Sequence, residues 1–192
     1  MSRAFTKEVD DAPDQDVIAT AVSELPPGVK NYMTPQGYKR FVDELHYLTE
    51  CGRPDVARLA SQAAAASESL EEQTQKRRLR QIDARIQFLR QRMEQAQIVD
   101  PTRRAVCDKV FFGATVEFEN RQGDVRRVSI VGVDEMDIAA GYITFLSPLA
   151  KALLRTSVGD VVAFQSPGGH DEFEILEVSY REIPMAPFSP TK

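Results

Sequence analysis

A repeated apolar spacing between residues 69 and 96 constrains this chain more than any other feature of its sequence. Residues at intervals of three and four form the seam of a coiled coil: Leu79, Ile82, Ile86, Leu89, Met93 and Ala96. At roughly 1.5 Å per residue, a helix of about 30 residues is about 45 Å long. An antiparallel hairpin built on such a helix buries too little to be a core, so we interpret it as a device for reach.

The preceding segment supplies the partner helix. Thr34-Pro35 predicts a helix start, because threonine can cap free amide groups and proline loses no hydrogen bond at the first helical position. An apolar stripe follows: Tyr38, Phe41, Leu45 and Leu48. Gly52-Arg53-Pro54 interrupts this stripe and predicts a kink or a short break. The stripe then resumes through Val56, Leu59, Ala60 and Ala63.

We place the bend of the hairpin between Ala65 and Ser69, where Ser69 and Glu72 match a capping box that would start the second helix. Towards the bend the seam turns polar, through Gln75, Glu72 and Glu68. This end is therefore not built to be buried within its own fold.

After Asp100-Pro101 the pattern changes to alternation, which predicts a separate β-rich domain and hence an α+β fold. We expect strands at 115–119, 125–133, 142–146, 161–164 and 173–178, with turns at 120–123 and 167–169. Ser147-Pro148 predicts a short helix at 149–154. The full division is an acidic disordered arm (1–32), the hairpin (33–100), the β-rich domain (101–182) and a loose, proline-rich tail (183–192).

Composition limits the function classes. A formal net charge of -5 argues against a protein that coats nucleic acid over its whole surface. The sequence has neither a membrane-spanning run nor a signal peptide, so we expect a cytoplasmic setting. Cys51 and Cys107 have no metal-ligand or disulfide spacing and are expected to be free thiols. The solitary His46 and His170 suggest no catalytic role.

Several segments together resemble the bacterial Gre transcription elongation factors, most of all their GreB branch. The resemblance runs from about residue 33 to residue 180 and follows the order and spacing of motifs that are individually weak. The matching segments are 33–38 (MTPQGY), 53–56 (RPDV), 76–83 (KRRLRQID), 98–100 (IVD), 109–114 (KVFFGA), 130–135 (IVGVDE), 147–154 (SPLAKALL) and 158–160 (VGD).

The resemblance implies a coiled-coil hairpin followed by a domain similar to the FKBP fold. That domain would dock on RNA polymerase at its secondary channel, while the hairpin tip reaches towards the active site of a backtracked or arrested complex. The tip acids would help hold a second Mg²⁺ and a water, so that polymerase cleaves its own transcript. The factor would then be no enzyme and have no cofactor of its own, and would meet template DNA only through the elongation complex.

The tip departs from the family pattern, which has an aspartate followed three residues later by a glutamate and then an asparagine. Here these positions are Ala65, Glu68 and Ser69. Glu68 is thus the matching tip acid, with Glu71 and Glu72 as weaker candidates, because Mg²⁺ prefers carboxylate oxygens. Alternatively, these glutamates merely favour the positive end of a helix. We expect transcript cleavage to be weakened or lost.

A basic stretch near the tip and one loop of the β-rich domain are the other candidate contacts. By resemblance, Lys76, Arg77, Arg78 and Arg80 would meet the 3′ RNA segment. Alternatively, the basic residues form ordinary ion pairs with acids of the first helix, which is the interpretation that we prefer for Arg85 to Arg92. Leu146, Ser147 and Pro148 occupy the family's docking loop, with leucine in place of an acid. Pro148 alternatively just begins a helix.

Two other functions stay open. One is a non-cleaving regulator of the same channel, which Ala65 and Leu146 favour. The other is a prolyl isomerase, which only the FKBP-like domain suggests and which no set of residues supports.

Overall fold

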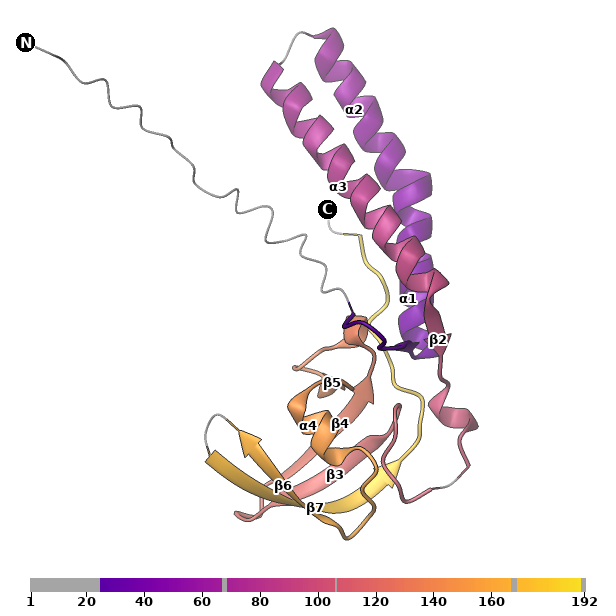
Figure 1. The fold of residues 1–192 in the computed structure, drawn as a ribbon. Helices are drawn as coiled ribbons and strands as arrows, with labels where there is room; N and C mark the ends of the chain where they lie inside the picture. The colour runs from indigo at the N-terminus through magenta and orange to yellow at the C-terminus, as the bar shows by residue number, and fades with distance from the viewer. Residues whose placement is uncertain (1–24, 67–68, 106, 167–168, 191–192) are drawn as a thin grey trace, which may run out of the picture.

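A computed structural model describes residues 25–66, 69–105, 107–166 and 169–190. Figure 1 shows a long helical hairpin standing on a smaller domain with a curled sheet, which confirms the α+β fold. In the chain, the hairpin lies between two short strands, Asn31–Met33 and Ala96–Ile98, and a 3-10 turn (Pro101–Arg103) leads on to the sheet domain.

The first arm of the hairpin begins as predicted. Helix α1 (Pro35–Tyr47) is capped by Thr34, whose side chain accepts a hydrogen bond from the backbone of Gly37 at 3.1 Å. The predicted break does not occur. Instead a π-helical turn (Leu48–Gly52) leads into α2 (Arg53–Ala65), and Arg53 N donates to the Leu48 carbonyl. This wider turn keeps the backbone helical where Pro54 offers no amide hydrogen.

The second arm is helix α3 (Ser69–Glu94), which packs against α2 along the predicted seam. Ile86 and Leu89 are buried from α3, and Val56 and Ala63 are buried from α2. Leu59, predicted for the same stripe, is 38% exposed. The helix includes Ser69 as its first residue, so it begins at the position predicted for its cap.

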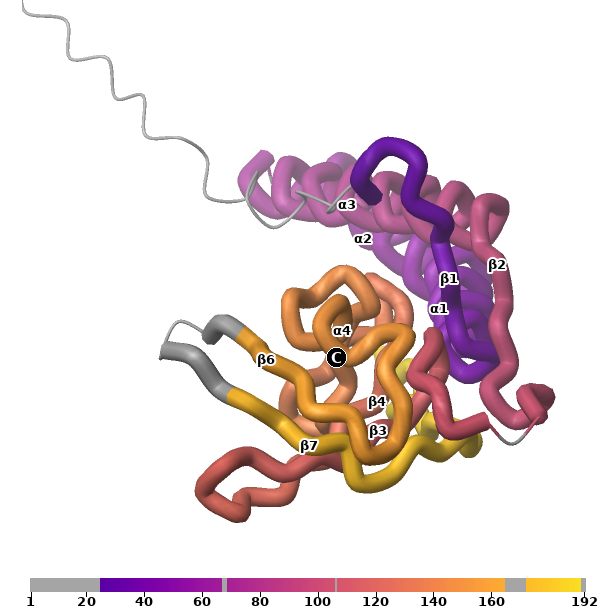
Figure 2. The backbone as a smooth tube through the Cα atoms, turned by 60° about the horizontal axis from the view of Figure 1, so that its bottom comes forward, coloured from indigo at the N-terminus to yellow at the C-terminus, as the bar shows by residue number. Residues whose placement is uncertain are grey.

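A two-stranded parallel ladder closes the base of the hairpin. Strand β1 (Asn31–Met33) pairs with β2 (Ala96–Ile98), and the two lie side by side in Figure 2. Met33 packs in a cluster with Phe41 and Leu89. The predicted arm was therefore set too long, because its residues 31 and 32 belong to this ladder; residues 1–24 of the arm lie outside the described residues.

The second domain is a five-stranded sheet with the order β5-β4-β3-β7-β6. Its strands are β3 (Thr115–Asn120), β4 (Val125–Val131), β5 (Tyr142–Thr144), β6 (Val161–Ser166) and β7 (Gly169–Ser179). Neighbouring strands are antiparallel except β4 and β5. The predicted turn at 120–123 is confirmed, and Gly123 adopts a φ of 87° there, a conformation that favours glycine. The predicted turn at 167–169 falls largely outside the described residues.

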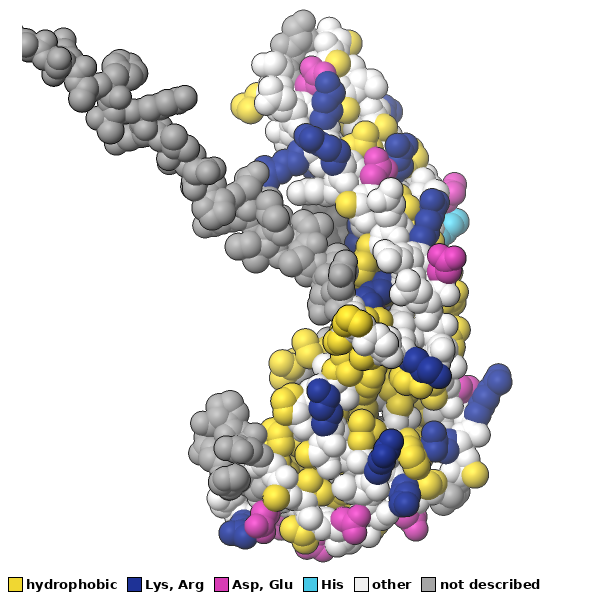
Figure 3. Space-filling model, in the orientation of Figure 1, with side chains coloured by type: hydrophobic (Ala, Val, Ile, Leu, Met, Phe, Trp, Pro, Cys, Tyr) yellow, Lys and Arg dark blue, Asp and Glu magenta, His cyan; other side chains and the backbone are white. Residues whose placement is uncertain are grey.

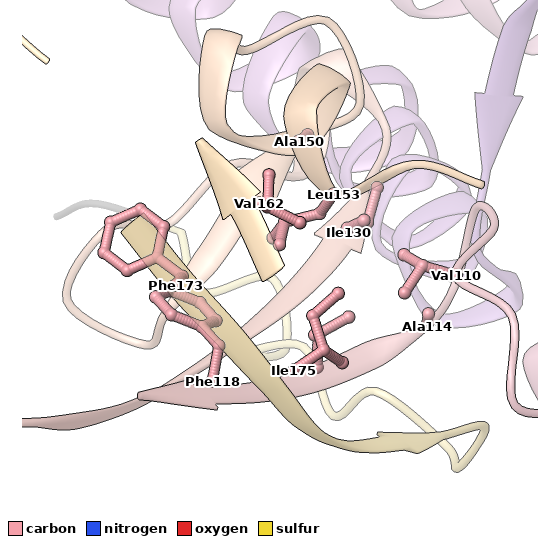
Figure 4. Packing of buried hydrophobic residues seen from close by; sticks show 10 residues of the cluster. Val110, Ala114, Phe118, Ile130, Ala150, Leu153, Val162, Phe173 and Ile175 are labelled. Carbon is pink, nitrogen blue, oxygen red and sulfur yellow. The ribbon is translucent and has the colours of Figure 1, made fainter. Parts of the chain in front are cut away.

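One face of the sheet packs under helix α4 (Pro148–Leu153) to form the core. Figure 4 shows Phe118 of β3 beside Phe173 of β7, with ring centroids 4.9 Å apart. Ala150 and Leu153 of α4 cover the same cluster. Apolar and polar side chains alternate along residues 115–119, so the apolar ones lie on this core face and the polar ones on the outer face.

A buried carboxylate joins the two parts. Glu135 lies at the end of the 3-10 turn Val133–Glu135 that follows β4, and is 3% exposed. Its carboxylate accepts hydrogen bonds from Thr34 N at 2.9 Å, from the Thr34 hydroxyl, and from Gly132 N at 2.7 Å. Any β-carbon at Gly37 would collide with this carboxylate, so the helix can approach it only with glycine there.

Other contacts support the junction around Glu135. Arg92, near the end of α3, is 5% exposed and its Nε lies 3.4 Å from Oδ2 of Asp134. The ring of Tyr32 lies 5.4 Å from that of Phe112 and 5.8 Å from that of Phe145, centroid to centroid. Polar and aromatic contacts therefore hold the hairpin base to the sheet domain.

The tail predicted to be loose makes contacts on both parts of the molecule. We call residues 181–190 the C-terminal strap. Ile183 is 2% exposed, and the ring of Phe188 lies 5.6 Å from that of Tyr47. The prediction was wrong here because a proline-rich composition does not show which apolar residues find a partner.

Two smaller expectations concern the cysteines and the membrane. Cys51 and Cys107 are free, as predicted. In the part of the chain that the structure describes, no helix is both long and apolar enough to cross a membrane.

Replacing Glu135 with alanine should destabilise the protein strongly. The change leaves the buried amides of Thr34 and Gly132 without their acceptor, and each lost partner costs about 1–3 kcal/mol. We expect the free energy of unfolding, measured with urea, to fall by about 2–4 kcal/mol. The exposed Glu174→Ala change is the matched control and should have little effect. Equal effects of the two changes would contradict the role given to Glu135.

The same carboxyl predicts a pH dependence. Burial raises the pKa of Glu135 above its ordinary value of 4.5, although hydrogen bonds from Thr34 and Gly132 lower it. A carboxyl with a higher pKa in the folded state binds more protons when folded, so its contribution to stability is lost as the pH rises through that pKa. The Glu135→Gln variant lacks this titration.

We therefore expect the unfolding free energy of the unchanged protein, minus that of Glu135→Gln, to decrease as the pH rises from 4.5 towards neutrality. Urea unfolding at several pH values measures this difference. A difference that grows with pH would mean that the hydrogen bonds outweigh burial.

Candidate functional site

The apex of the hairpin is formed where α2 ends and α3 begins. Ala65 is the last residue of α2, Ala66 follows it, and α3 starts at Ser69. Ala65 is exposed, and its methyl group can neither bind a cation nor order a water. Glu68, the predicted tip acid, lies outside the described residues.

The two weaker candidate acids are held by their own helix. Glu72 Oε1 lies 2.5 Å from Nζ of Lys76, and Glu71 Oε1 accepts a hydrogen bond of 2.5 Å from Gln75 Nε2. Among the described residues, no three His, Cys, Asp or Glu side chains gather in a group that could hold a metal ion. The described part of the tip thus does not fit a Mg²⁺ site of its own.

The predicted RNA contacts are exposed side chains of α3 that point in different directions around the helix, because successive residues are about 100° apart. Lys76, Arg77, Arg78 and Arg80 are all exposed, and Figure 3 shows basic side chains gathered on the upper half of the hairpin. Lys76 pairs with Glu72 of the same helix, whereas no ion pair within the described part of the chain holds Arg78 or Arg80. These cations are available to an anionic partner at little cost, because an exposed ion pair is weak.

Sequence reasoning missed a shallow groove beside this basic surface. It has a volume of ≈ 450 Å³ and is lined by Leu70, Gln73, Thr74, Lys76, Arg77 and Arg80. Leu70 is 78% exposed. A leucine just after the bend and off the apolar seam was the signal that could have indicated it.

The arginines closer to the base have structural partners. Arg85 Nε donates to Glu44 Oε1 at 2.7 Å, and its guanidinium lies 4.9 Å from the ring centroid of Phe88. The predicted pairing with an acid of the first helix is thus confirmed for Arg85. Arg92 differs, because the acid beside it is Asp134 of the sheet domain rather than an acid of α1.

The candidate docking loop lies between β5 and α4. Ser147 caps α4 by accepting a hydrogen bond from Ala150 N at 3.1 Å, and Pro148 is the first residue of the helix. Both therefore have the helix-start role that the sequence allowed. Pro148 is exposed and Leu146 is half-buried, so the loop presents an apolar rather than an acidic surface.

The two histidines do not add to a site. His46 is exposed on α1 and belongs to no group of metal-ligating side chains among the described residues. The side chain of His170 lies outside the described part of the chain.

Comparison with known proteins gives consistent matches for both parts of the chain. Residues 31–98 match the family described as "Transcription elongation factor, N-terminal", and residues 105–180 match "Transcription elongation factor, GreA/GreB, C-term". A transcription elongation factor GreB of Neisseria meningitidis is 43% identical over 157 residues, which cover 80% of this chain and 96% of that protein. One from Yersinia pestis is 45% identical over 154 residues, covering 79% and 90%.

Among solved structures, the GreA factor homolog 1 (Gfh1) protein of Thermus thermophilus is 24% identical, with a TM-score of 0.36. The match covers 78% of this chain and 99% of that chain.

Proposed function

Because this chain belongs to the GreA/GreB family of transcription elongation factors, as the resemblance predicted, we propose that it binds bacterial RNA polymerase at the secondary channel and acts on backtracked or arrested complexes. The observation that carries this proposal is the hairpin itself, whose basic and polar end is held away from the sheet domain (Figure 1). The relatives named GreB agree with the predicted branch of the family.

The dimensions of the hairpin suit a probe. The 26 residues of α3 give a length of about 39 Å at roughly 1.5 Å per residue. The apolar seam is buried near the base, whereas near the tip the buried position is taken by Gln75. Such a helix is stabilised from its base and keeps its tip polar, as entry into a hydrated channel requires.

Transcript cleavage would be carried out by polymerase, with this chain as an auxiliary. A Mg²⁺ ion in the polymerase active site would polarise the phosphate and the attacking water. This chain would contribute Glu68, the one acid that matches the family pattern, and Ala65 would contribute no ligand. With one acid in place of two, we expect weak cleavage stimulation. The alternative is a regulator that occupies the channel without cleavage.

The other contacts follow the surface chemistry of the chain. The basic surface of α3 would bind the 3′ segment of the nascent RNA, and the loop at Leu146, Ser147 and Pro148 would dock on polymerase. Template DNA would be met only through the elongation complex, and the chain would act in the cytoplasm with no cofactor of its own.

Replacing Ala65 with aspartate should raise transcript cleavage. Loss of a side chain that supports a metal site typically costs about 10–100-fold, so restoring one should raise the cleavage rate of backtracked complexes by about tenfold or more. The neighbouring exposed Ala66→Asp change adds the same charge and is the control. If the unchanged protein already stimulates cleavage as fast as a Gre factor that has both tip acids, the weak-cleavage proposal is disproved.

Replacing Lys76, Arg77 and Arg78 together with alanine should weaken crosslinking to the transcript several-fold. Each lost phosphate contact should also reduce the dependence of log affinity on log salt by about 0.7 for single-stranded RNA. A variant with Lys39, Arg58 and Arg90 replaced removes the same charge from other exposed positions. If both variants crosslink equally well, the RNA contact is not on this surface.

Leu146→Asp tests the docking loop. A charge placed in an apolar contact should weaken binding to polymerase by about tenfold, equivalent to about 1.4 kcal/mol. The exposed Gln122→Asp change, in the turn between β3 and β4, is the control. An affinity that does not change would show that this loop is not the contact, and a tighter complex would show that polymerase presents a charged partner.

A further inference from the structure

The C-terminal strap, residues 181–190, lies outside the two ranges that match the family. It leaves the sheet domain after β7 and continues along the hairpin, as the yellow segment in Figure 1 shows. It has no helix or strand of its own, so its path depends on its side-chain and carbonyl contacts.

At its start the strap is fixed to the sheet domain. Ile183 is 2% exposed, and Tyr142 Oη donates a hydrogen bond of 2.7 Å to the carbonyl of Pro184. Tyr142 belongs to β5, the edge strand next to β4. The strap therefore runs from β7 to the opposite edge of the sheet, at β5.

Two further contacts fix the strap to the hairpin. Gln36 Nε2, in the first turn of α1, donates a hydrogen bond of 2.7 Å to Glu182 Oε1. The ring of Phe188 lies 5.6 Å from the ring of Tyr47, an aromatic contact worth more than its buried area alone. Tyr47 is the last residue of α1 and directly precedes the π-helical turn.

The position of Tyr47 matters because the hairpin is a lever. Across the plane of its two helices the hairpin base is one helix thick, about 10 Å, whereas the apex at Ala65 lies about 46 Å along the helices from the contacts around Glu135. In that direction, a displacement of about 1 Å at the base becomes a displacement of about 5 Å at the apex. Tyr47 lies about 20 Å along the hairpin from its base. A displacement of about 1 Å at its contact with Phe188 therefore becomes only about 2 Å at the apex.

The composition of the strap suits a brace. Pro184, Pro187 and Pro190 fix the backbone at every third position and lower the entropy lost on ordering. The residues between them include Met185 and Phe188, which are half-buried.

We propose that the C-terminal strap braces the hairpin against the sheet domain, and that Ile183 and Phe188 are positioning residues that set where the tip lies. The brace follows from the contacts of this chain alone. Its effect on transcript cleavage rests on the function proposed above. The strap would hold the tip in place without touching substrate or polymerase active-site atoms.

Distances between spin labels test the brace in the absence of polymerase. With Cys51 and Cys107 changed to serine, new cysteines at Ser61 and Gln122 would carry the labels on exposed positions of α2 and the sheet domain. Phe188→Ala should broaden the distance distribution, because the displacement possible at the tip grows from about 2 Å to about 5 Å. Phe188→Tyr, which keeps a ring, and the exposed Ser189→Ala should leave it unchanged.

A distribution that is the same in Phe188→Ala and the parent protein would overturn the proposal. Thermal melting of each variant confirms that the chain is folded, and Ile183→Val offers a second, milder change at the other end of the strap. A broadened distribution in Ser189→Ala as well would equally overturn it, since the effect would then not come from the ring contact.

Kinetics with polymerase test the positioning role. In the Ala65→Asp background, Phe188→Ala should lower the maximal cleavage rate by about tenfold, because a misplacement of about 1 Å can cost up to 100-fold. The half-saturating concentration should stay within about twofold, because the docking loop is unchanged and uniform binding is preserved. A broadened distribution with an unchanged maximal rate would overturn the positioning role. If no variant stimulates cleavage, the proposed function is contradicted. The spin-label distances then still test whether the strap braces the hairpin.

Discussion

The carboxylate of Glu135 is the interaction on which the arrangement of this molecule depends. It is buried, and it accepts hydrogen bonds from the first residues of the hairpin and from the sheet domain at once. A buried carboxylate is costly unless it is fully hydrogen-bonded, so the hairpin base and the sheet domain have to meet in one geometry. Arg92 and Asp134 lie next to it as a largely buried ion pair, with Nε 3.4 Å from Oδ2.

This junction allows the two ends of the molecule to be specialised separately. The base is apolar, with Met33, Phe41 and Leu89 packed together. The tip has Gln75 in the seam, exposed cations along α3 and an exposed Leu70. Charges at the tip therefore do not compete with folding. Ala65, at the end of α2, presents a methyl group at the apex where a carboxylate could have bound a cation.

Features that depend on local chemistry were predictable from the sequence. Thr34-Pro35, the turn ending at Gly123 and Ser147-Pro148 all lie where their residue types require. The π-helical turn was missed, because a proline signals a disturbance and not the form it takes.

Features that depend on distant partners could not be predicted. Thr34 and Glu135 are far apart in sequence, as are the two strands that close the hairpin base and the rings of Tyr47 and Phe188. The same holds in the candidate site. The pairing of Arg85 could be predicted because its partner lies on the neighbouring helix of the hairpin. The acid beside Arg92 comes from the sheet domain. The groove beside Leu70 could be found only from the three-dimensional surface of the helix.

We propose that the hairpin carries its apex into polymerase, and a photocrosslinker placed at position 66 would test this proposal. The account predicts that the purified chain associates with bacterial RNA polymerase and that the apex crosslinks to residues around the polymerase active site. A probe at the exposed position 122 of the sheet domain should not reach that region. Failure to associate with polymerase, or crosslinks from position 66 confined to the outer surface, would contradict the account.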